Sequence, residues 1–371
     1  MIYADYAATA PLSERVYETL CRVSRDTFGN PSSAHSCGRA AAALVDRARE
    51  QTAALLGCDP GEIVFTSGGT EADNHAVRFA EGRSVLTSAI EHPAVLNAVR
   101  NTASRIHMVA PGADGRVSAD RIAAVLREVP EIALVSLMYA NNETGVIQPV
   151  REAADAAHAA GALFHCDAVQ GAGHRMPTVR ELDCDLLSVS GHKFHAPKGI
   201  GALYIRKSLA GQVPPLLYGG GQQHGLRSGT LPVPLIAAFG EACAEAAEVM
   251  REEDVRVRRL RDAMAEDLLA IPESMRIGAG DTLPGILNIA FAGTYAENLM
   301  LLCDLRGVCL SAGSACHAGT DTPSHVLEAM RVPEEYRSSA VRISIGRFTS
   351  AEDAARIAAV VRECVALARE G

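Results

Sequence analysis

Short apolar runs alternate with stretches of helical periodicity along the first two thirds of the chain. Uninterrupted apolar runs of this length are typical of strands that are buried on both faces of a sheet. They predict strands at 62–65, 84–87, 132–138, 162–166, 185–189 and 202–205. Among the helical stretches between them, 39–56 stops at Gly57 and 151–160 stops at Gly161. Glycine just beyond the last helical residue is the expected end signal.

This alternation predicts an α/β fold with a largely parallel sheet that carries helices on both faces. A long helical region at 232–270 follows, and the pattern then changes. Strands are indicated at 285–292 and 340–345, and helices at 295–306, 323–330 and 350–369. We therefore expect a large domain at 15–259 and a smaller α+β domain at 260–371, against which residues 1–14 pack.

Composition narrows the class of protein. The chain has 371 residues, 48% of them apolar, which is enough for a large core. A net charge of −9 argues against a general nucleic-acid binder. No apolar run is long enough for a membrane span, and the start, Met1 to Asp5, meets an acid before any basic region of a signal peptide. We expect a cytoplasmic protein without a nucleic-acid or membrane partner.

Cysteine and histidine spacing gives no sign of a metal site. The chain has ten cysteines and no Cys-x-x-Cys pair, so neither a structural zinc site nor a disulfide framework is expected. His192 and His195 are three residues apart, but the sequence offers no third ligand beside them. We expect no metal.

Lysine and aspartate each follow a predicted buried strand. Lys193 ends the segment Ser190-Gly191-His192-Lys193 after the strand 185–189, and Asp167 directly follows the strand 162–166. A lysine can form a Schiff base with pyridoxal phosphate, and a carboxylate can keep the pyridine nitrogen protonated so that the ring accepts electrons. Without the lysine, Asp167 would be interpreted as a helix N-cap. Together the two residues indicate pyridoxal 5'-phosphate as the cofactor.

A glycine-rich turn is a candidate phosphate site. Thr66-Ser67-Gly68-Gly69-Thr70-Glu71 follows the strand 62–65 and opens a helix that continues to about Phe79. The free N–H groups of a helix N-terminus bind anions, although a Gly-Gly pair is more commonly plain turn chemistry. The segment lacks the Gly-Lys-Ser/Thr of a Walker motif. Ser190 and His192 are further candidates for phosphate contacts.

Three other polar residues have two interpretations each. His92 precedes Pro93, so it is either a surface residue before a helix or a ring that stacks on the cofactor. Asn142 lies in Asn141-Asn142-Glu143-Thr144-Gly145, which is either a polar turn or the source of an amide for the cofactor or substrate. Arg342 lies in the apolar strand 341–344, where a structural ion pair and a substrate carboxylate are both suitable partners.

Cys316 lies in a segment of small residues, Ser311-Ala312-Gly313-Ser314-Ala315-Cys316, and His317 follows it. A neighbouring histidine favours the thiolate, which is the nucleophilic form. The alternative, a buried structural cysteine, is less favoured because bulky apolar neighbours are missing. A glycine-rich segment at 219–230 predicts a loop near the site.

As an ordered set, these segments resemble the cysteine desulfurases of the iron–sulfur-assembly type, within the class V aminotransferase group of fold type I pyridoxal-phosphate enzymes. The matching segments cover nearly the whole chain: 4–9, 66–74, 91–93, 141–145, 167–170, 190–193, 227–230, 311–316 and 342–347. The resemblance implies a mostly parallel seven-stranded sheet between helices, a smaller C-terminal domain that carries the cysteine loop, and a homodimer. Tyr6 departs from the pattern, in which asparagine is usual.

The resemblance also implies roles. Lys193 would hold the cofactor and move the Cα proton, Asp167 would bind the ring nitrogen, and His92 would stack on the ring and take part in acid–base steps. The other cofactor contacts would be Gln170 and Asn142 near the ring oxygen, then Gly69, Thr70, Ser190 and His192 at the phosphate, and Thr230 at the phosphate of the neighbouring subunit.

For the substrate, the resemblance implies that Arg342, with Asn142, binds the carboxylate of L-cysteine. Cys316 would take the sulfur as a persulfide, leave L-alanine, and pass the sulfur to an acceptor protein, either an iron–sulfur scaffold or a thiolation enzyme. Three alternatives remain open at this point. They are a selenocysteine lyase, a class V aminotransferase without sulfur transfer, and a relative that has lost its chemistry.

Overall fold

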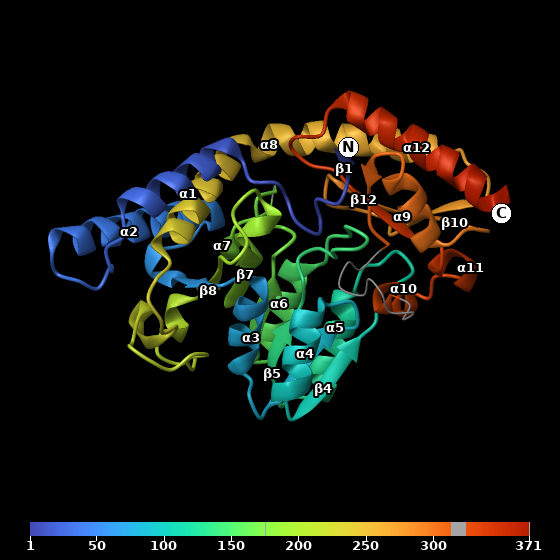
Figure 1. Cartoon of the computed structure of the whole chain (residues 1–371). Coiled ribbons are helices and arrows are strands. Elements are labelled where there is room, and N and C mark those ends of the chain that lie inside the picture. The colour runs from blue at the N-terminus through green and yellow to red at the C-terminus, as the bar shows by residue number, and fades with distance from the viewer. Residues whose placement is uncertain (175, 313–323, 371) are drawn as a thin grey trace.

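A seven-stranded sheet forms the centre of the protein (Figure 1). The computed structural model describes residues 1–174, 176–312 and 324–370. The strand order is β2-β8-β7-β6-β5-β3-β4, and only β8 runs antiparallel to its neighbours. The predicted α/β fold with a mostly parallel sheet is confirmed. The strands are β2 (Ile63–Thr66), β3 (Ser84–Ser88), β4 (Arg105–Val109), β5 (Ile132–Ser136), β6 (Leu163–Asp167), β7 (Leu186–Ser190) and β8 (Gly201–Ile205).

Helices cover the sheet and connect its strands. They are α1 (Glu14–Asp26), α2 (Ser36–Leu56), α3 (Gly69–Arg78), α4 (Pro93–Thr102), α5 (Ala119–Glu128), α6 (Val150–Ala159) and α7 (Val179–Leu182). Gly57 ends α2 at a φ of 71°, a left-handed conformation that glycine adopts without strain. The sequence predicted this end correctly. Two separate apolar clusters pack on the sheet, one with α6 and the first half of α8, the other with α3 and α4.

One long helix, α8 (Val233–Leu269), joins the central sheet to the C-terminal part of the chain. Figure 1 shows it running along one side of the molecule from α1 and α2 toward α12. Its first half contributes Ile236 and Phe239 to the core of the sheet, and its second half contributes Met264 and Leu268 to a separate core. The domain boundary at 259/260 falls inside this helix and stays a prediction.

The C-terminal part contains a second, smaller sheet of order β12-β10-β9, all antiparallel. Its elements are β9 (Ser274–Ile277), β10 (Ile286–Phe291), β12 (Val341–Ser344), α9 (Ala296–Asp304), α10 (His325–Ala329), α11 (Glu334–Arg337) and α12 (Ala351–Glu370). The N-terminus also lies here, because β1 (Ile2–Tyr3) pairs in parallel with β11 (Val308–Cys309). A few residues later the chain reaches the end of β7, where the N–H of Ala10 donates to the carbonyl of His192 at 2.7 Å.

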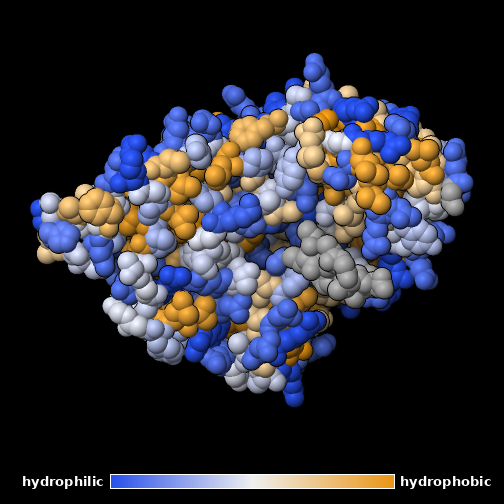
Figure 2. Space-filling model, viewed as in Figure 1, coloured by the Kyte–Doolittle hydropathy of each residue, from blue (hydrophilic) through white to orange (hydrophobic). Residues whose placement is uncertain are grey.

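The surface mixes polar and apolar groups (Figure 2). Leu301 and Leu305, one helical turn apart on and just after α9, are 60% and 72% exposed, whereas single exposed apolar side chains elsewhere are ordinary. Across the described ranges, no helix is both long and apolar enough to cross a membrane. In the same ranges, no group of three or more His, Cys, Asp or Glu side chains could hold a metal ion.

Candidate active site

The candidate residues gather where the parallel strands of the central sheet end. Asp167 is the last residue of β6 and Ser190 the last of β7. The two strands pair in parallel, with Asp167 opposite Ser188, so their ends adjoin. A single 3-10 turn, Gly191–Lys193, then carries Lys193. Ligand sites of open α/β sheets form at this edge, so the position of these residues is compatible with the predicted site.

Lys193 points back toward the N-terminal segment. Its Nζ donates hydrogen bonds to the carbonyl oxygens of Ala7 (2.8 Å) and Ala8 (2.9 Å). Burial has the largest effect on the pKa of both His92 and Asp167, and the positive charge of Lys193 acts on both in the lowering direction. The amine therefore lies within electrostatic reach of both groups, as a shared site requires.

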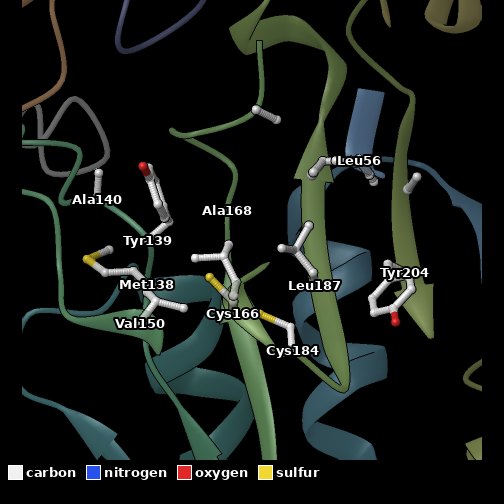
Figure 3. Packing of buried hydrophobic residues seen from close by; sticks show 14 of the residues in the cluster. Leu56, Met138, Tyr139, Ala140, Val150, Cys166, Ala168, Cys184, Leu187 and Tyr204 are labelled. Atoms are coloured by element: carbon white, nitrogen blue, oxygen red, sulfur yellow. The ribbon is translucent and has the colours of Figure 1, made fainter. Parts of the chain in front are cut away.

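The carboxylate of Asp167 is almost completely buried. It is only 5% exposed, and Figure 3 shows its chain neighbours Cys166 and Ala168 packed among apolar side chains. Burial raises the pKa of Asp167 to about 6, although the N–H of Val169, 2.9 Å from Oδ1, and the Lys193 charge act in the opposite direction. A pyridinium N–H would give this carboxylate the charged partner that favours its ionised form. The residue fits the ring nitrogen of pyridoxal phosphate.

His92 is held by the start of α4, of which it is the N-cap. Its Nδ1 accepts a hydrogen bond from the N–H of Ala94 at 3.1 Å, which places the ring proton on Nε2. Burial, followed by the charges of Lys193 and His325, lowers its pKa to about 4. The imidazole is therefore neutral near pH 7, and a neutral planar ring is suited to stacking.

The first turn of α3 forms a cradle for an anion. Gly68, the N-cap, has a φ of 151° and no side chain to close the turn, so the first N–H groups are left for a ligand. A Cβ on Gly69 would lie 2.6 Å from Val169 Cγ2, so the space admits only glycine. Ser190 is buried nearby, whereas Thr70 is exposed.

His192 allows a further test of whether the residues here fit a phosphate. Its Nδ1 is buried and has no hydrogen-bond partner within the described part of the chain. Burial, with the nearby charges of Lys193 and Lys198, lowers the pKa of His192 to about 4. A buried polar atom without a partner is costly, and a phosphate oxygen or hydroxyl would relieve that cost. The residues present therefore fit the phosphate end of the cofactor.

Asn142 and Gln170 were also predicted to contact the cofactor. The side chain of Asn141, not that of Asn142, holds the turn after β5, since its Oδ1 accepts from the N–H groups of Glu143 (2.9 Å) and Thr144 (3.0 Å). Asn142 is half-buried, and Gln170 Nε2 donates to the carbonyl of Ala7 at 3.0 Å. The roles of Asn142 and Gln170 stay predictions.

Thr230 is exposed at the end of a loop that the rest of the chain fixes in place. An ion pair between Arg227 and Glu71 (2.8 Å) ties the loop to the first turn of α3. Gln223 binds both the N–H and the carbonyl of Phe65 with its side-chain amide, each at 2.7 Å. The proposed contact of Thr230 with a second subunit stays a prediction.

Arg342 is buried at 2% exposure and already has an acidic partner. Its Nη2 donates to Asp5 Oδ1 at 2.6 Å, and its Nη1 donates to the carbonyl of Asn142 at 2.9 Å. Its Nε is buried without a hydrogen-bond partner among the residues that the structure describes. The structural ion pair expected as one interpretation is therefore present with Asp5, and the role of Arg342 in binding a substrate carboxylate stays a prediction.

Cys316 lies outside the described residues, but both flanks of its segment are anchored at the site. Ser311 exchanges two backbone hydrogen bonds with Arg342. On the other flank, Ser324 Oγ donates to Glu143 Oε2 at 2.6 Å, and His325 Nε2 donates to the carbonyl of Glu91 at 3.0 Å. The sequence analysis did not identify Ser324 or His325, because nothing in a helix start reveals a partner more than a hundred residues away.

Glu91 is a buried acid whose charge state is testable. It is fully buried, and its Oε1 accepts from Ser88 Oγ (2.5 Å) and from the N–H of Met138 (3.0 Å). Burial raises its pKa from 4.5 to about 8. The folded protein then binds more protons than the unfolded chain between these values, so Glu91 makes stability fall as pH rises through this window.

We expect the Glu91→Gln variant to lose this dependence, because the amide keeps the acceptor and never ionises. Its free energy of unfolding should match that of the wild type near pH 4.5 and exceed it above about pH 8, by a few kcal/mol at most. Urea unfolding of the cofactor-free protein at both ends of the window measures this. Glu334→Gln, which changes an exposed carboxyl in α11, is the control and should leave the slope unchanged. Equal slopes for Glu91→Gln and wild type would contradict a protonated Glu91.

The chain is similar to known proteins over nearly its whole length. Residues 2–357 match the aminotransferase class-V family. A cysteine desulfurase IscS from Serratia proteamaculans is 40% identical over all of this chain and 94% of its own length. Among solved structures, a NifS-like protein from Rickettsia africae superposes with a TM-score of 0.90 at 32% identity, covering 98% of this chain and 99% of that one. A structure described as SspA in complex with cysteine has a TM-score of 0.81 at 33% identity, covering 94% and 100%.

Proposed function

The chain belongs to the aminotransferase class-V family, and we propose that it is a pyridoxal 5'-phosphate-dependent cysteine desulfurase. The substrate is L-cysteine, and the products are L-alanine and a persulfide on Cys316. One observation supports this most strongly. The adjoining ends of β6 and β7 bring Asp167 and Lys193 together, with the anion cradle of α3 at the same edge. A carboxylate, an amine and a phosphate site in that arrangement match the functional groups of the cofactor.

The cofactor, when bound, accepts the electrons that are released as bonds to the substrate Cα break. The side chains of the protein bind the cofactor and move the proton. Asp167 would hold a positive charge at the ring nitrogen, the first turn of α3 and Ser190 would bind the phosphate, and the neutral imidazole of His92 would stack on the ring. The amine of Lys193 removes the proton from Cα and later returns a proton to carbon.

The sulfur transfer step balances without an external oxidant. The Cys316 thiolate attacks the sulfur of bound cysteine, an S–S bond forms, and the Cβ–S bond breaks. The electron pair of that bond stays on carbon, which takes up a proton and becomes the methyl group of L-alanine. Cys316 is left as a persulfide, which is the form that an acceptor thiol can take sulfur from.

The proposal includes two partners, a second subunit and a sulfur acceptor. The protein acts as a homodimer in the cytoplasm, with Thr230 reaching the phosphate of the neighbouring subunit, and passes sulfur to an iron–sulfur scaffold or a thiolation enzyme. The exposed position of Thr230, on a loop that Arg227 and Gln223 hold in place, supports the dimer. The exposed Leu301 and Leu305 on the α9 side of the molecule offer apolar area for partner contact.

The test is the stoichiometry of the reaction. The purified, cofactor-loaded protein is incubated with L-cysteine and a thiol reductant, and L-alanine and sulfide are measured separately. We expect equal amounts of the two products. Pyruvate and ammonia in place of alanine, or amino-group transfer to a keto acid, would contradict the proposal. Activity with L-selenocysteine and none with L-cysteine would reassign the protein as a selenocysteine lyase.

A further inference from the structure

The N-terminal segment lies between two cations of the candidate site. Asp5 pairs with Arg342 through its carboxylate, and the carbonyl oxygens of Ala7 and Ala8 accept from Lys193. The segment is added to the edge of β12, since the N–H of Ser344 donates to Ala4 (2.8 Å) and that of Tyr6 donates to Ser344 (3.1 Å). Backbone hydrogen bonds on both sides of Asp5 therefore fix where its carboxylate points.

A contact within the N-terminal segment also holds Asp5 in place. The Tyr3 hydroxyl lies within hydrogen-bond distance of the carbonyl oxygens of Asp5 (2.9 Å) and Thr9 (2.8 Å) and shares its one proton between them, which closes the segment into a compact turn. The side chain of Asp5 is 19% exposed, whereas that of Arg342 is 2% exposed. The carboxylate is thus a rigid partner for a guanidinium that has almost no access to water.

A guanidinium at this depth is stable only when it is paired, because an unpaired buried charge costs several kcal/mol. Asp5 at Nη2 and the Asn142 carbonyl at Nη1 take up two of its three nitrogens. These two contacts come from different parts of the fold and fix the plane of the group. The third nitrogen, Nε, is buried and has no hydrogen-bond partner in the described ranges. It is the edge that remains for a ligand.

We propose that Asp5 is a positioning residue for substrate recognition: it holds the Arg342 guanidinium so that its Nε edge receives the α-carboxylate of the amino-acid substrate. This inference rests on the proposed function, because it assigns the carboxylate-binding group of the same site. It adds a residue whose contact with the substrate is indirect. Loss of the Asp5 carboxylate frees the guanidinium to turn, so carboxylate binding weakens while amine binding does not.

The experiment compares amines with and without a carboxylate. In the cofactor-loaded protein, L-cysteine, L-alanine and cysteamine are titrated, and the half-saturating concentration is read from the change in the visible absorption of the cofactor. Asp5→Ala should raise the value for L-cysteine and L-alanine about ten- to a hundredfold, the range expected when a charge-assisted hydrogen bond is lost. The value for cysteamine should stay within about twofold of that of the wild type. KM for L-cysteine should rise more than kcat falls.

Two further variants make the result decisive. Asp5→Asn keeps an oxygen that accepts from Arg342, so it should restore most of the carboxylate preference, and it serves where Asp5→Ala does not fold. Asp267→Ala removes an acid from the exposed ion pair with Arg362 and should change nothing. Equal losses for L-alanine and cysteamine, or no loss for either, would overturn the role of Asp5. If the wild type binds L-alanine and releases none from L-cysteine, the proposed function fails while the test of Asp5 still stands.

Discussion

Replacing Lys193 by alanine should lower L-alanine release from L-cysteine by at least about a thousandfold. Lys193 is the residue proposed both to attach the cofactor and to move the Cα proton. A positioned general base alone raises the reaction rate about 10²- to 10⁴-fold. No other lysine can take over, because Lys198 and Lys207, the remaining lysines of the chain, are exposed. The measurement is the initial rate of L-alanine formation at saturating L-cysteine.

The matched control for this variant is Lys207→Ala, since Lys207 follows β8 and its side chain is exposed. It should keep the wild-type rate and visible absorption. Lys193→Ala should still bind the cofactor, because Asp167, His92 and the α3 cradle remain, although its absorption should differ from that of the wild type. A Lys193→Ala variant with more than about a tenth of the wild-type rate would remove Lys193 from the role of proton carrier.

Replacing Cys316 by serine should abolish sulfur transfer while leaving substrate binding intact. A hydroxyl has neither the acidity nor the nucleophilicity of a thiol, so we expect the rate of L-alanine formation to fall at least about a hundredfold. The change in visible absorption on addition of L-cysteine should remain, because Arg342 and the cofactor contacts are unchanged. Rapid-mixing absorption and an L-alanine assay on the same sample separate the two steps.

Cys37 provides the control for this second variant. It is an exposed thiol near the start of α2, outside the candidate site, and Cys37→Ser should keep the full rate. Full activity in Cys316→Ser would contradict the assignment of the nucleophile. It would favour the aminotransferase alternative, which needs no thiol.

The central strands could be predicted from the sequence because burial on both faces leaves an uninterrupted apolar run. All six runs in the first two thirds of the chain correspond to strands within one or two residues. The edge strands β4 and β9 were not predicted, since β4 reads Arg-Ile-His-Met-Val and β9 reads Ser-Met-Arg-Ile, so polar residues interrupt the apolar run in both. The two-residue strands β1 and β11 are too short for any periodicity.

Residues of the candidate site could be predicted where they directly follow a strand. They could not be predicted where their role depends on a contact with a residue far away in the sequence. Asp167, Ser190 and Lys193 stand at strand ends, and parallel topology brings such ends together. Asp5 was visible only as part of an N-terminal motif, because its partner Arg342 is 337 residues away. Asn141 and Asn142 could not be told apart by sequence, since either amide of an Asn-Asn pair can hold the turn.

If Lys193, beside Asp167, holds the cofactor, the linkage can be located directly on the chain. Borohydride converts the link between the cofactor aldehyde and a lysine amine into a stable bond, and peptide mass spectrometry then locates it. The chain offers only Lys193, Lys198 and Lys207. We expect a phosphopyridoxyl group on Lys193 and on no other residue. A label on Lys198 or Lys207, or no label in protein that has been loaded with the cofactor, would contradict it.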